Sequence, residues 1–461
     1  MNAATVALAI GIPTVMLEDE LGDLVGSADN ASEAIHRWYP FKESFSHQLP
    51  TLICKWLKPE NGGVALDVFA GVGTTALAFD ASSFDSAIGV EYSPFAHFVG
   101  QAKLAWSSLD PEEVAGQIPR ALGYRVKGDL QPPGLSSFSN EAIFAPDRLQ
   151  ALLSARRHLL AIDLSEAQRD FFMLGLAAVI EESSGAIKDG RALRILNGRR
   201  RASKLLRPDR QLEPCDDFVR DALAQQWWGM QEDIAALAHS SGERNTALHH
   251  LRGDARQLAE VKFASGKRAL EPASVRLSIF SPPYLNCIDY SEIYKLEIWL
   301  LEMVGDREAF RELRRGTLRS HPSIEFPNRG YLAAAEGSWV ALVETISTFV
   351  ERNGARAHIG EMIRNYFGDM YRVFAQQLWV LEPGAWMVCV VGNSTFSRRI
   401  QNGDGREEQW RIPLLTDVIL ARMAESLGFV DVQIWSAREL RARNVRNGKA
   451  RESAVVARKP A

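Results

Sequence analysis

The stretch that decides the fold reads GGVALDVFAGVGTTALAFDASSFDSAIGVEYS and runs from Gly62 to Ser93. Residues 64–69 are a short apolar run with one acidic residue, which predicts a buried strand. Gly71 and Gly73 interrupt this run, and the TTALAFDA sequence after them has the composition of a helix. A strand, a glycine turn and a helix in this order predict the first unit of a nucleotide-binding α/β sheet.

A second strand and an acidic residue complete this pattern. Residues 86–90 are mostly apolar, and Glu91 follows them, 20 residues after Gly71. A carboxylate at the end of this strand can accept hydrogen bonds from ribose hydroxyls, while the glycines let backbone N–H groups approach a ligand. Gly71, Gly73 and Ala76 also satisfy the loose glycine rule of dinucleotide enzymes. The pattern alone therefore leaves open a nicotinamide or flavin site, an S-adenosylmethionine site, or a glycine turn with no ligand.

The composition is that of a soluble globular protein. Of 461 residues, 46% are hydrophobic and 24% are charged, and the net charge of −4 does not by itself indicate a polyanionic partner. The four cysteines are scattered without a CxxC pair, which argues against a disulfide framework and a structural zinc site. Residues 1–35 have no basic residue before their apolar run, so we expect an N-terminal extension instead of a signal peptide. We therefore expect a cytoplasmic protein with no membrane partner.

One segment departs from this charge balance. The sequence KDGRALRILNGRRRASKLLRPDR, residues 188–210, holds nine basic residues and two acidic ones. It belongs to a stretch, 109–247, whose apolar residues recur at spacings of three and four, which predicts a helical insertion. Most charge runs are only solvated faces, but a basic edge on a helical insertion also suits contact with phosphate. The candidate nucleic-acid-binding residues are Lys188, Arg191, Arg194, Arg199, Arg200 and Arg201.

A second informative break lies later, in the sequence SIFSPPYLNCIDY. Residues 275–280 predict a strand, and Ser-Pro-Pro-Tyr follows at its carboxyl end, the edge where ligands bind in open α/β sheets. In isolation a proline turn that caps a strand would explain this sequence equally well. Upstream, the sequence HHLRGDAR places Asp254 and Ala255 in a loop after another short apolar stretch, where Asp254 can meet the amino group of an adenine.

The series DVFAGVGTT, VEYS, GDAR and SIFSPPYLNCIDY resembles the S-adenosylmethionine-dependent DNA methyltransferases that modify exocyclic amino groups. The Ser-Pro-Pro-Tyr form is typical of members that act on cytosine N4, whereas Asp-Pro-Pro-Tyr is commoner in those that act on adenine N6. The sequence WYPFKESFSHQLPTLICKWL resembles the element of this family that packs against the methionine end of the cofactor. The likeness covers residues 36–108 and 248–459.

The resemblance implies an α/β fold: a Rossmann-like sheet of seven mostly parallel strands with a C-terminal antiparallel hairpin. The catalytic domain then comprises residues 36–108 and 248–461. The insertion, 109–247, is a first candidate for DNA binding and target recognition, and residues 302–360 are a second. The implied cofactor is S-adenosylmethionine. Its implied binding residues are Phe41, Asp67, Phe69, Ala70, Gly71, Gly73, Thr74, Glu91, Tyr92, Asp254 and Ala255.

The chemistry of amino methylation gives each residue of Ser-Pro-Pro-Tyr a role. The exocyclic nitrogen of cytosine is a poor nucleophile because its lone pair is delocalised into the ring. The Ser281 hydroxyl and the Pro282 carbonyl can accept hydrogen bonds from the amino group, and Pro283 helps to fix the direction of that carbonyl. Tyr284 offers a ring face on which a flipped base stacks. This direct transfer needs no covalent intermediate, so Cys215 in EPCDD is interpreted as incidental.

We therefore expect an enzyme that transfers a methyl group to cytosine N4 in duplex or single-stranded DNA, together with a restriction or defence-system partner. Adenine N6 stays open as the alternative target. Two alternatives come from other classes: a catalytically inactive nucleic-acid-binding protein of the same fold and a nicotinamide-dependent oxidoreductase. The intact Ser-Pro-Pro-Tyr and glycine motifs count against the first. The second is disfavoured because no catalytic His/Lys or Tyr/Lys constellation is evident.

Overall fold

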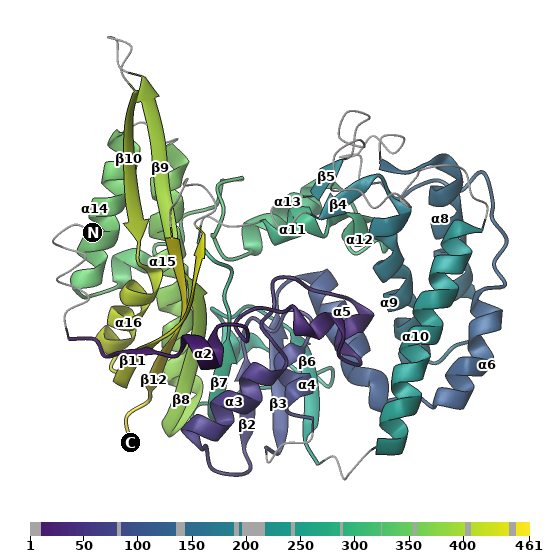
Figure 1. Cartoon of the computed structure of the whole chain (residues 1–461), viewed down its shortest axis with the longest axis horizontal. Helices are drawn as coiled ribbons and strands as arrows, with labels where there is room; N and C mark the ends of the chain where they lie inside the picture. Colours follow the sequence, from purple (N-terminus) through teal and green to yellow (C-terminus); the bar gives the residue numbers. More distant parts are fainter. Residues whose placement is uncertain are drawn as a thin grey trace.

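The computed structural model describes residues 11–80, 84–134, 143–188, 193–195, 217–240, 245–285, 289–323, 325–353, 357–401, 407–441 and 449–461. In this part of the chain a central sheet is flanked by helices on both faces (Figure 1). A helical insertion lies on one side of the sheet, and a long hairpin, β9 (Ser394–Gln401) with β10 (Glu407–Leu414), projects from the other side.

The central sheet has eight strands among the described residues, in the order β1-β11-β12-β8-β7-β2-β3-β6. Their bounds are Thr14–Met16 (β1), Val64–Asp67 (β2), Ser86–Glu91 (β3), Ala247–Arg252 (β6), Val275–Phe280 (β7), Leu381–Gly392 (β8), Val430–Arg441 (β11) and Lys449–Arg458 (β12). Neighbouring strands are parallel except for β12, which is antiparallel to both β8 and β11. The mostly parallel sheet with a C-terminal hairpin is thus confirmed, and β1 adds an eighth strand to the seven expected.

Both faces of the sheet are buried, and successive side chains of a strand point to opposite faces. On β7, Phe280 packs into one helical layer and its neighbour Ile279 into the other. The first layer contains α14 (Ser338–Arg352), α15 (Ala357–Val380) and α16 (Thr416–Ser426). The second layer contains α2 (Glu18–Leu21), α3 (Gln48–Leu57) and α4 (Thr74–Ala78).

The strand order reverses between β2 and β7. From β2 the chain moves outward through β3 to β6, and from β7 it moves in the opposite direction to β8. In an open α/β sheet such a reversal leaves a crevice at the carboxyl ends of the strands. Because Leu66 of β2 pairs with Ser278 of β7, the loop after Asp67 and the loop after Phe280 lie side by side at that edge.

In the interval 109–247, where a helical insertion is expected, the described residues are mainly helical and pack against the elements around the sheet. Its elements are α6 (Pro111–Ala121), α8 (Pro146–Ala161), α9 (Glu166–Ser183), β4 (Ala186–Lys188), β5 (Leu193–Ile195) and α10 (Phe218–Ser240). They share one apolar core with α5 (Pro94–Leu104), α12 (Lys295–Leu300) and α13 (Arg307–Gly316). On α10, Asp233 accepts hydrogen bonds from the backbone N–H of Ile35 and the indole of Trp38, which fixes the segment before α3.

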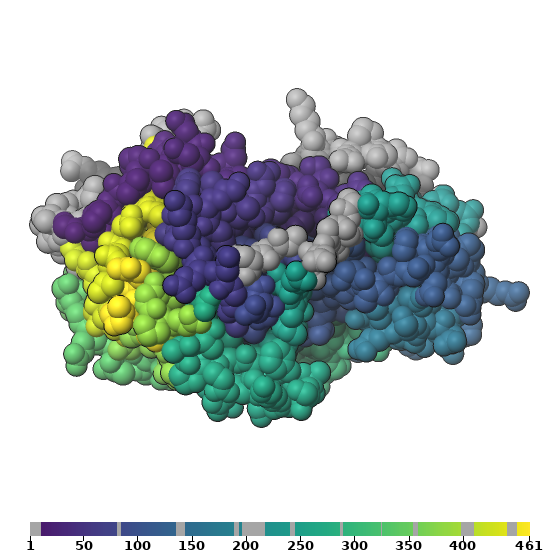
Figure 2. Space-filling model, turned by 90° about the horizontal axis from the view of Figure 1, so that it is seen from below, coloured from purple at the N-terminus to yellow at the C-terminus, as the bar shows by residue number. Residues whose placement is uncertain are grey.

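The described part of the N-terminal extension also belongs to this unit. Thr14 of β1 pairs with Ile434 of β11, and Leu21 and Val25 are buried in the layer of α3 and α4. Figure 2 shows this N-terminal segment, in purple, lying against the C-terminal strands in yellow. No helix in the described ranges is long and apolar enough to cross a membrane.

The close packing of α9 on α10 gives a test of the shared core. Gly175 of α9 lies against Trp227, where a Cβ would stand 2.3 Å from the ring atom Cδ1. We expect Gly175→Ala to displace this buried ring and to lower the free energy of unfolding by about 1–3 kcal/mol. Calorimetry should show a single transition at lower temperature, because the insertion shares its core with α5, α12 and α13.

Gly116→Ala on α6 is the matched control, since nothing lies within 4 Å of a Cβ there, and it should not lower the melting temperature. A separate early transition in Gly175→Ala would contradict the shared core.

Candidate active site

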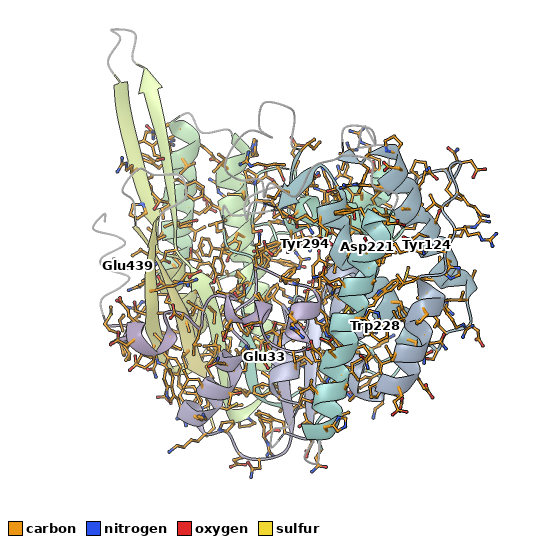
Figure 3. All side chains as sticks on the ribbon, turned by 45° about the vertical axis from the view of Figure 1, so that its right-hand side comes forward. Glu33, Tyr124, Asp221, Trp228, Tyr294 and Glu439 are labelled. Atoms are coloured by element: carbon orange, nitrogen blue, oxygen red, sulfur yellow. The ribbon has the colours of Figure 1, made fainter. Side chains whose placement is uncertain are left out.

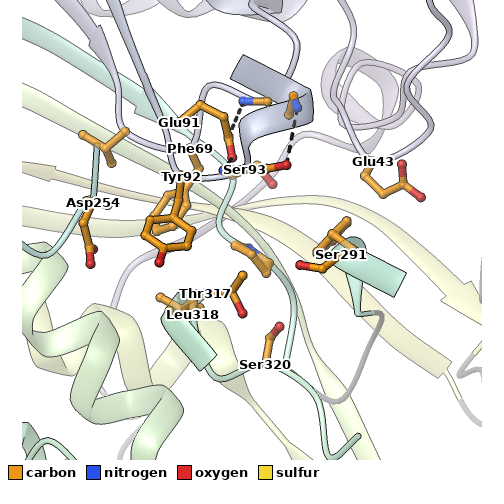
Figure 4. Close-up of a pocket in the computed structure, with 18 of the residues that line it drawn as sticks. Glu43, Phe69, Glu91, Tyr92, Ser93, Asp254, Ser291, Thr317, Leu318 and Ser320 are labelled. Carbon is orange, nitrogen blue, oxygen red and sulfur yellow. Dashed lines mark hydrogen bonds between the residues drawn. The ribbon is translucent and has the colours of Figure 1, made fainter. Parts of the chain in front are cut away.

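A cleft opens at the carboxyl ends of β2, β3, β6 and β7 and encloses ≈ 940 Å³, including its open mouth (Figure 4). This volume is in the range of small-molecule and cofactor sites. The residues proposed from the sequence that line it are Phe41, Phe69, Gly71, Glu91, Tyr92, Asp254, Ala255, Ser281 and Pro283. The glycine turn and the Ser-Pro-Pro-Tyr loop therefore share one cavity, although they are far apart in the sequence.

The glycine turn leaves space in front of Phe41. Gly71 has φ = +51° and Gly73 has φ = +86°, both in the left-handed region that favours glycine. A Cβ at Gly71 would stand 3.5 Å from Cε1 of Phe41, and one at Gly73 would stand 2.8 Å from Cδ1 of Leu104. Glycine at position 71 therefore keeps the cleft open, and glycine at position 73 lets the turn pack on α5.

Glu91 connects the glycine turn to the end of β3. Its carboxylate accepts hydrogen bonds from the backbone N–H groups of Gly71 (2.9 Å) and Ser93 (2.6 Å), as Figure 4 shows. Burial raises the pKa of Glu91, while these two hydrogen bonds act in the opposite direction. Each carboxylate oxygen can accept a second hydrogen bond. Glu91 can therefore hold the turn and still accept a hydrogen bond from a ribose hydroxyl.

Some of the proposed cofactor residues lie behind the turn and not on the cleft lining. Asp67, at the end of β2, is buried and accepts hydrogen bonds from the N–H of Phe69 (2.9 Å) and the hydroxyl of Thr75 (2.5 Å). These bonds define the shape of the turn from its inner side. The proposed cofactor residues outside the lining are Asp67, Ala70, Gly73 and Thr74.

Asp254 is held by Arg256, a residue that the sequence motifs did not single out. The guanidinium donates from Nε to Oδ1 of Asp254 (2.8 Å) and from Nη2 to Oδ2 (2.7 Å). Its Nη1 donates to the buried Asp369 on α15 (2.9 Å), and the carbonyl of Gly316 accepts a further bond. Arg256 therefore links the acidic wall of the cleft to α15 and α13. The arginine is visible in GDAR, but Asp369 lies 113 residues away, which no local pattern reveals.

The Ser-Pro-Pro-Tyr loop reaches the cleft through Ser281 and Pro283, whereas Pro282 and Tyr284 are not among the lining residues. The Tyr284 ring lies against Gly392 at the end of β8, where a Cβ would stand 2.7 Å from Cδ2 of the ring. One edge of this ring is therefore occupied by the sheet. The role of Tyr284 as a stacking surface for a base stays a prediction.

Aromatic rings from other segments form a wall of the cleft. Phe41 and Tyr294 stack with their centroids 5.0 Å apart and their planes at 16°, and Tyr290 also lines the cleft. The Tyr294 hydroxyl donates a hydrogen bond to the carboxylate of Glu43, whose pKa is raised by burial. Tyr294 and Glu43 were not predicted as site residues, because their contact joins segments 251 residues apart.

The segment after α13 contributes a further side of the cleft, through Thr317, Leu318 and Ser320 (Figure 4). His321 of the same segment also lines the cleft. This segment belongs to the interval 302–360, the second candidate for target recognition. Whether this interval reads a DNA sequence stays a prediction, but its residues share the cavity with the Ser-Pro-Pro-Tyr loop.

Lys188, proposed as a contact to nucleic acid, is buried, and that assignment is corrected. Its ammonium group donates to the fully buried carboxylate of Glu297 and to the hydroxyl of Tyr39 (2.9 Å). The Lys188 ammonium group is also 4.9 Å from the centroid of the Tyr294 ring. Tyr294 lies where the insertion meets the rest of the molecule (Figure 3). A lysine that is 9% exposed and neutralises a buried carboxylate is not available to phosphate.

The other proposed basic residues are only partly described. Arg194 is exposed on β5. Arg191, Arg199, Arg200 and Arg201 lie outside the described residues.

Comparisons with known proteins give two relatives aligned along most of their length. The chain is 24% identical over 450 residues to the Type II methyltransferase M.BsoBI of Geobacillus stearothermophilus, covering 90% of this chain and 82% of that protein. It is 22% identical over 434 residues to the Type II methyltransferase M.AvaI of Nostoc sp., covering 88% and 81%. A solved rRNA methyltransferase, aviRa from Streptomyces viridochromogenes, matches at 10% identity with a TM-score of 0.28, covering 95% of this chain and 90% of that one. No protein-family model matches the chain.

The buried pair of Lys188 and Glu297 can be tested by removing its charges. Lys188→Met leaves Glu297 buried without a counter-charge, and we expect it to lower the free energy of unfolding by about 3–5 kcal/mol. The double variant Lys188→Met, Glu297→Gln should recover much of this loss because neither charge remains. The measurement is chemical denaturation, with the exposed Lys127→Met of the same insertion as the control. If Lys188→Met has the same free energy of unfolding as the wild type, the assignment of a buried ion pair between Lys188 and Glu297 is wrong.

Asp67 predicts a pH dependence of stability. Burial raises its pKa from 3.8 to about 7, against the hydrogen bonds from Thr75 and Phe69. Between these values the folded chain binds more protons than the unfolded chain. The contribution of Asp67 is therefore fully present below about pH 4 and is lost as the pH rises to about 7.

Asp67→Asn should flatten this fall in the free energy of unfolding by up to about 1.4 kcal/mol per pH unit. Urea denaturation across the window measures it, with the exposed Asp163→Asn as the control. Equal slopes in wild type and Asp67→Asn would exclude a raised pKa at this site.

Proposed function

We propose that the protein is an S-adenosylmethionine-dependent DNA methyltransferase that modifies the exocyclic N4 amino group of cytosine. The observation that carries this proposal is the meeting of Ser281 and Pro283 with Gly71 and Glu91 in one cleft. The long alignments with two Type II methyltransferases support methylation of DNA as the reaction. Serine at position 281, where an aspartate is commoner in adenine enzymes, is the reason for choosing cytosine over adenine N6.

The cleft fits the cofactor. Gly71 leaves free the space beside Phe41, where a side chain would stand. Glu91 offers carboxylate acceptors for ribose hydroxyls, and Asp254 offers one for the amino group of an adenine. Phe69 adds apolar surface to the same lining. When bound, S-adenosylmethionine supplies an electrophilic methyl group on a positively charged sulfur.

The chain's own residues then prepare the target nitrogen. The Ser281 hydroxyl and the Pro282 carbonyl accept hydrogen bonds from the two N–H bonds of the amino group. This favours a more pyramidal nitrogen whose lone pair points at the methyl group. The nitrogen would gain the methyl group as the bond from that carbon to sulfur breaks, and it would then lose one proton to solvent. Because the transfer would neutralise the positive charge of the donor and need little acid assistance, positioning and electrostatics by the chain's residues would carry most of the rate enhancement.

The base must be outside a duplex to reach this cleft. Flipping it out costs a few kcal/mol of stacking and pairing, and less where the base is already unpaired. Within the proposal, the enzyme acts on a flipped or unpaired base. Its cellular setting is a cytoplasmic restriction-modification system, in which a restriction enzyme is the functional partner.

The test is methyl transfer followed by identification of the product. Unmethylated genomic DNA is incubated with the chain and S-adenosylmethionine carrying an isotopically labelled methyl group, then digested for mass spectrometry of nucleosides. We expect labelled N4-methylcytosine. Ser281→Ala should lower the rate by about 100-fold, the loss typical of removing one transition-state hydrogen bond, with cofactor affinity unchanged in calorimetry. Ser265→Ala, in an exposed loop, is the control.

The other outcomes separate the alternatives. N6-methyladenine without N4-methylcytosine would overturn cytosine as the target. Cofactor binding without methyl transfer to any nucleic acid would favour an inactive binding protein. Binding of NAD in place of S-adenosylhomocysteine would favour an oxidoreductase.

A further inference from the structure

A second groove lies on the other side of Tyr92 from the cleft. It encloses ≈ 930 Å³, including its open mouth, and Tyr92 and Gly316 line both cavities. A Cβ at Gly316 would stand 1.7 Å from the Tyr92 hydroxyl oxygen, so only glycine lets the ring close against the last turn of α13. The Tyr92 ring and Gly316 therefore form the partition between the cleft and this groove.

Arginines dominate the charge of this groove, which we call the arginine groove. Among the described residues that line it, three are arginines, Arg252, Arg315 and Arg329, and one, Glu312, is acidic. Arg315 donates to Glu312 (2.6 Å) and so is neutralised locally. Among the described residues neither Arg252 nor Arg329 takes part in a direct ion pair, although the carboxylates of Glu91 and Asp369 act on them electrostatically. Two guanidinium groups therefore line the groove without a direct ion-pair partner in the described ranges.

The rest of the lining is apolar. Arg252 stands over the Tyr92 ring, with its guanidinium carbon 5.6 Å from the centroid. Met303, Val304 and Leu313 complete this surface. Guanidinium groups suit phosphate because their planar forks can donate paired hydrogen bonds, and a ring with apolar neighbours suits sugars and unstacked bases. This combination matches a nucleic-acid strand better than it matches a small polar ligand.

We propose that the arginine groove binds the sugar-phosphate backbone next to the nucleotide whose base enters the cleft. This inference rests on the proposed function. Because Tyr92 and Gly316 line both cavities, the groove lies directly beside the cleft, and a strand that places one base in the cleft can lay its backbone in the groove. The groove also supplies cations that Lys188 does not, because Lys188 is committed to Glu297 in the interior.

The experiment measures how nucleic-acid affinity depends on salt. The variants are Arg252→Gln, Arg329→Gln and the double variant. Each is titrated with a fluorescent random-sequence DNA at several salt concentrations, once as a duplex and once as a single strand. Each lost phosphate contact should make the slope of log K against log salt shallower by about 0.9 for duplex and about 0.7 for single strand. Arg268→Gln is the matched control, since this exposed arginine lies outside the groove and pairs with Glu271. Affinity for S-adenosylmethionine, measured by calorimetry, should stay unchanged in all variants.

Three results would overturn the inference. Slopes equal to that of the wild type in both single variants would show that neither arginine meets phosphate. An equal change in Arg268→Gln would show a general charge effect without a groove. Lost cofactor affinity with an unchanged slope would assign the groove to the cofactor. Because the readout is binding, it stands even if no methyl transfer is found, so failure of the groove and failure of the proposed reaction are told apart.

Discussion

The pairing of β2 with β7 is the constraint on which the site depends. These neighbouring strands are followed by the glycine turn and by Ser-Pro-Pro-Tyr, and the sheet order reverses between them. Parallel strands joined by crossovers on both sides leave the two loops unobstructed at one edge. Glu91, at the end of the next strand, then reaches back to the N–H of Gly71. A different strand order would place these residues at separate points of the edge.

The insertion depends on the same arrangement, since it packs on the elements that surround the cleft. Asp233 fixes the segment that leads to Phe41, and Lys188 neutralises Glu297 beside the aromatic wall. Removing one partner from a buried pair leaves an uncompensated charge, which costs more than the pair contributes when it is intact. The insertion therefore shares the buried core of the elements around the cleft, and the proposed DNA binding by its basic segment would be added to that structural role.

Local physics accounts for what the sequence predicted. Glycines with positive φ, an acidic residue after a buried strand and a proline pair after another are all determined within a few residues, and Gly71, Glu91 and Pro283 from these motifs line one cleft. The site residues that the sequence motifs did not identify are positioned by partners far away in the chain. Arg256 is fixed by Asp369, and Tyr294 by Glu43, across more than a hundred residues. Lys188 was misassigned for the same reason: it belongs to a basic run, but its partner Glu297 lies 109 residues away.

In the proposed reaction, the choice of base cannot rest on the loop alone. The Ser281 hydroxyl and the Pro282 carbonyl would accept the same two N–H bonds from cytosine N4 or adenine N6, since both are amino groups conjugated to a ring. Cytosine and adenine differ in ring size and in the edge beyond the amino group. In the proposed arrangement that edge would meet the other side of the cleft, where Tyr290 and the segment with Ser320 and His321 lie. We therefore expect residues of the interval 302–360 and α11 (Tyr290–Ile293) to add to the discrimination between the bases that Ser281 begins.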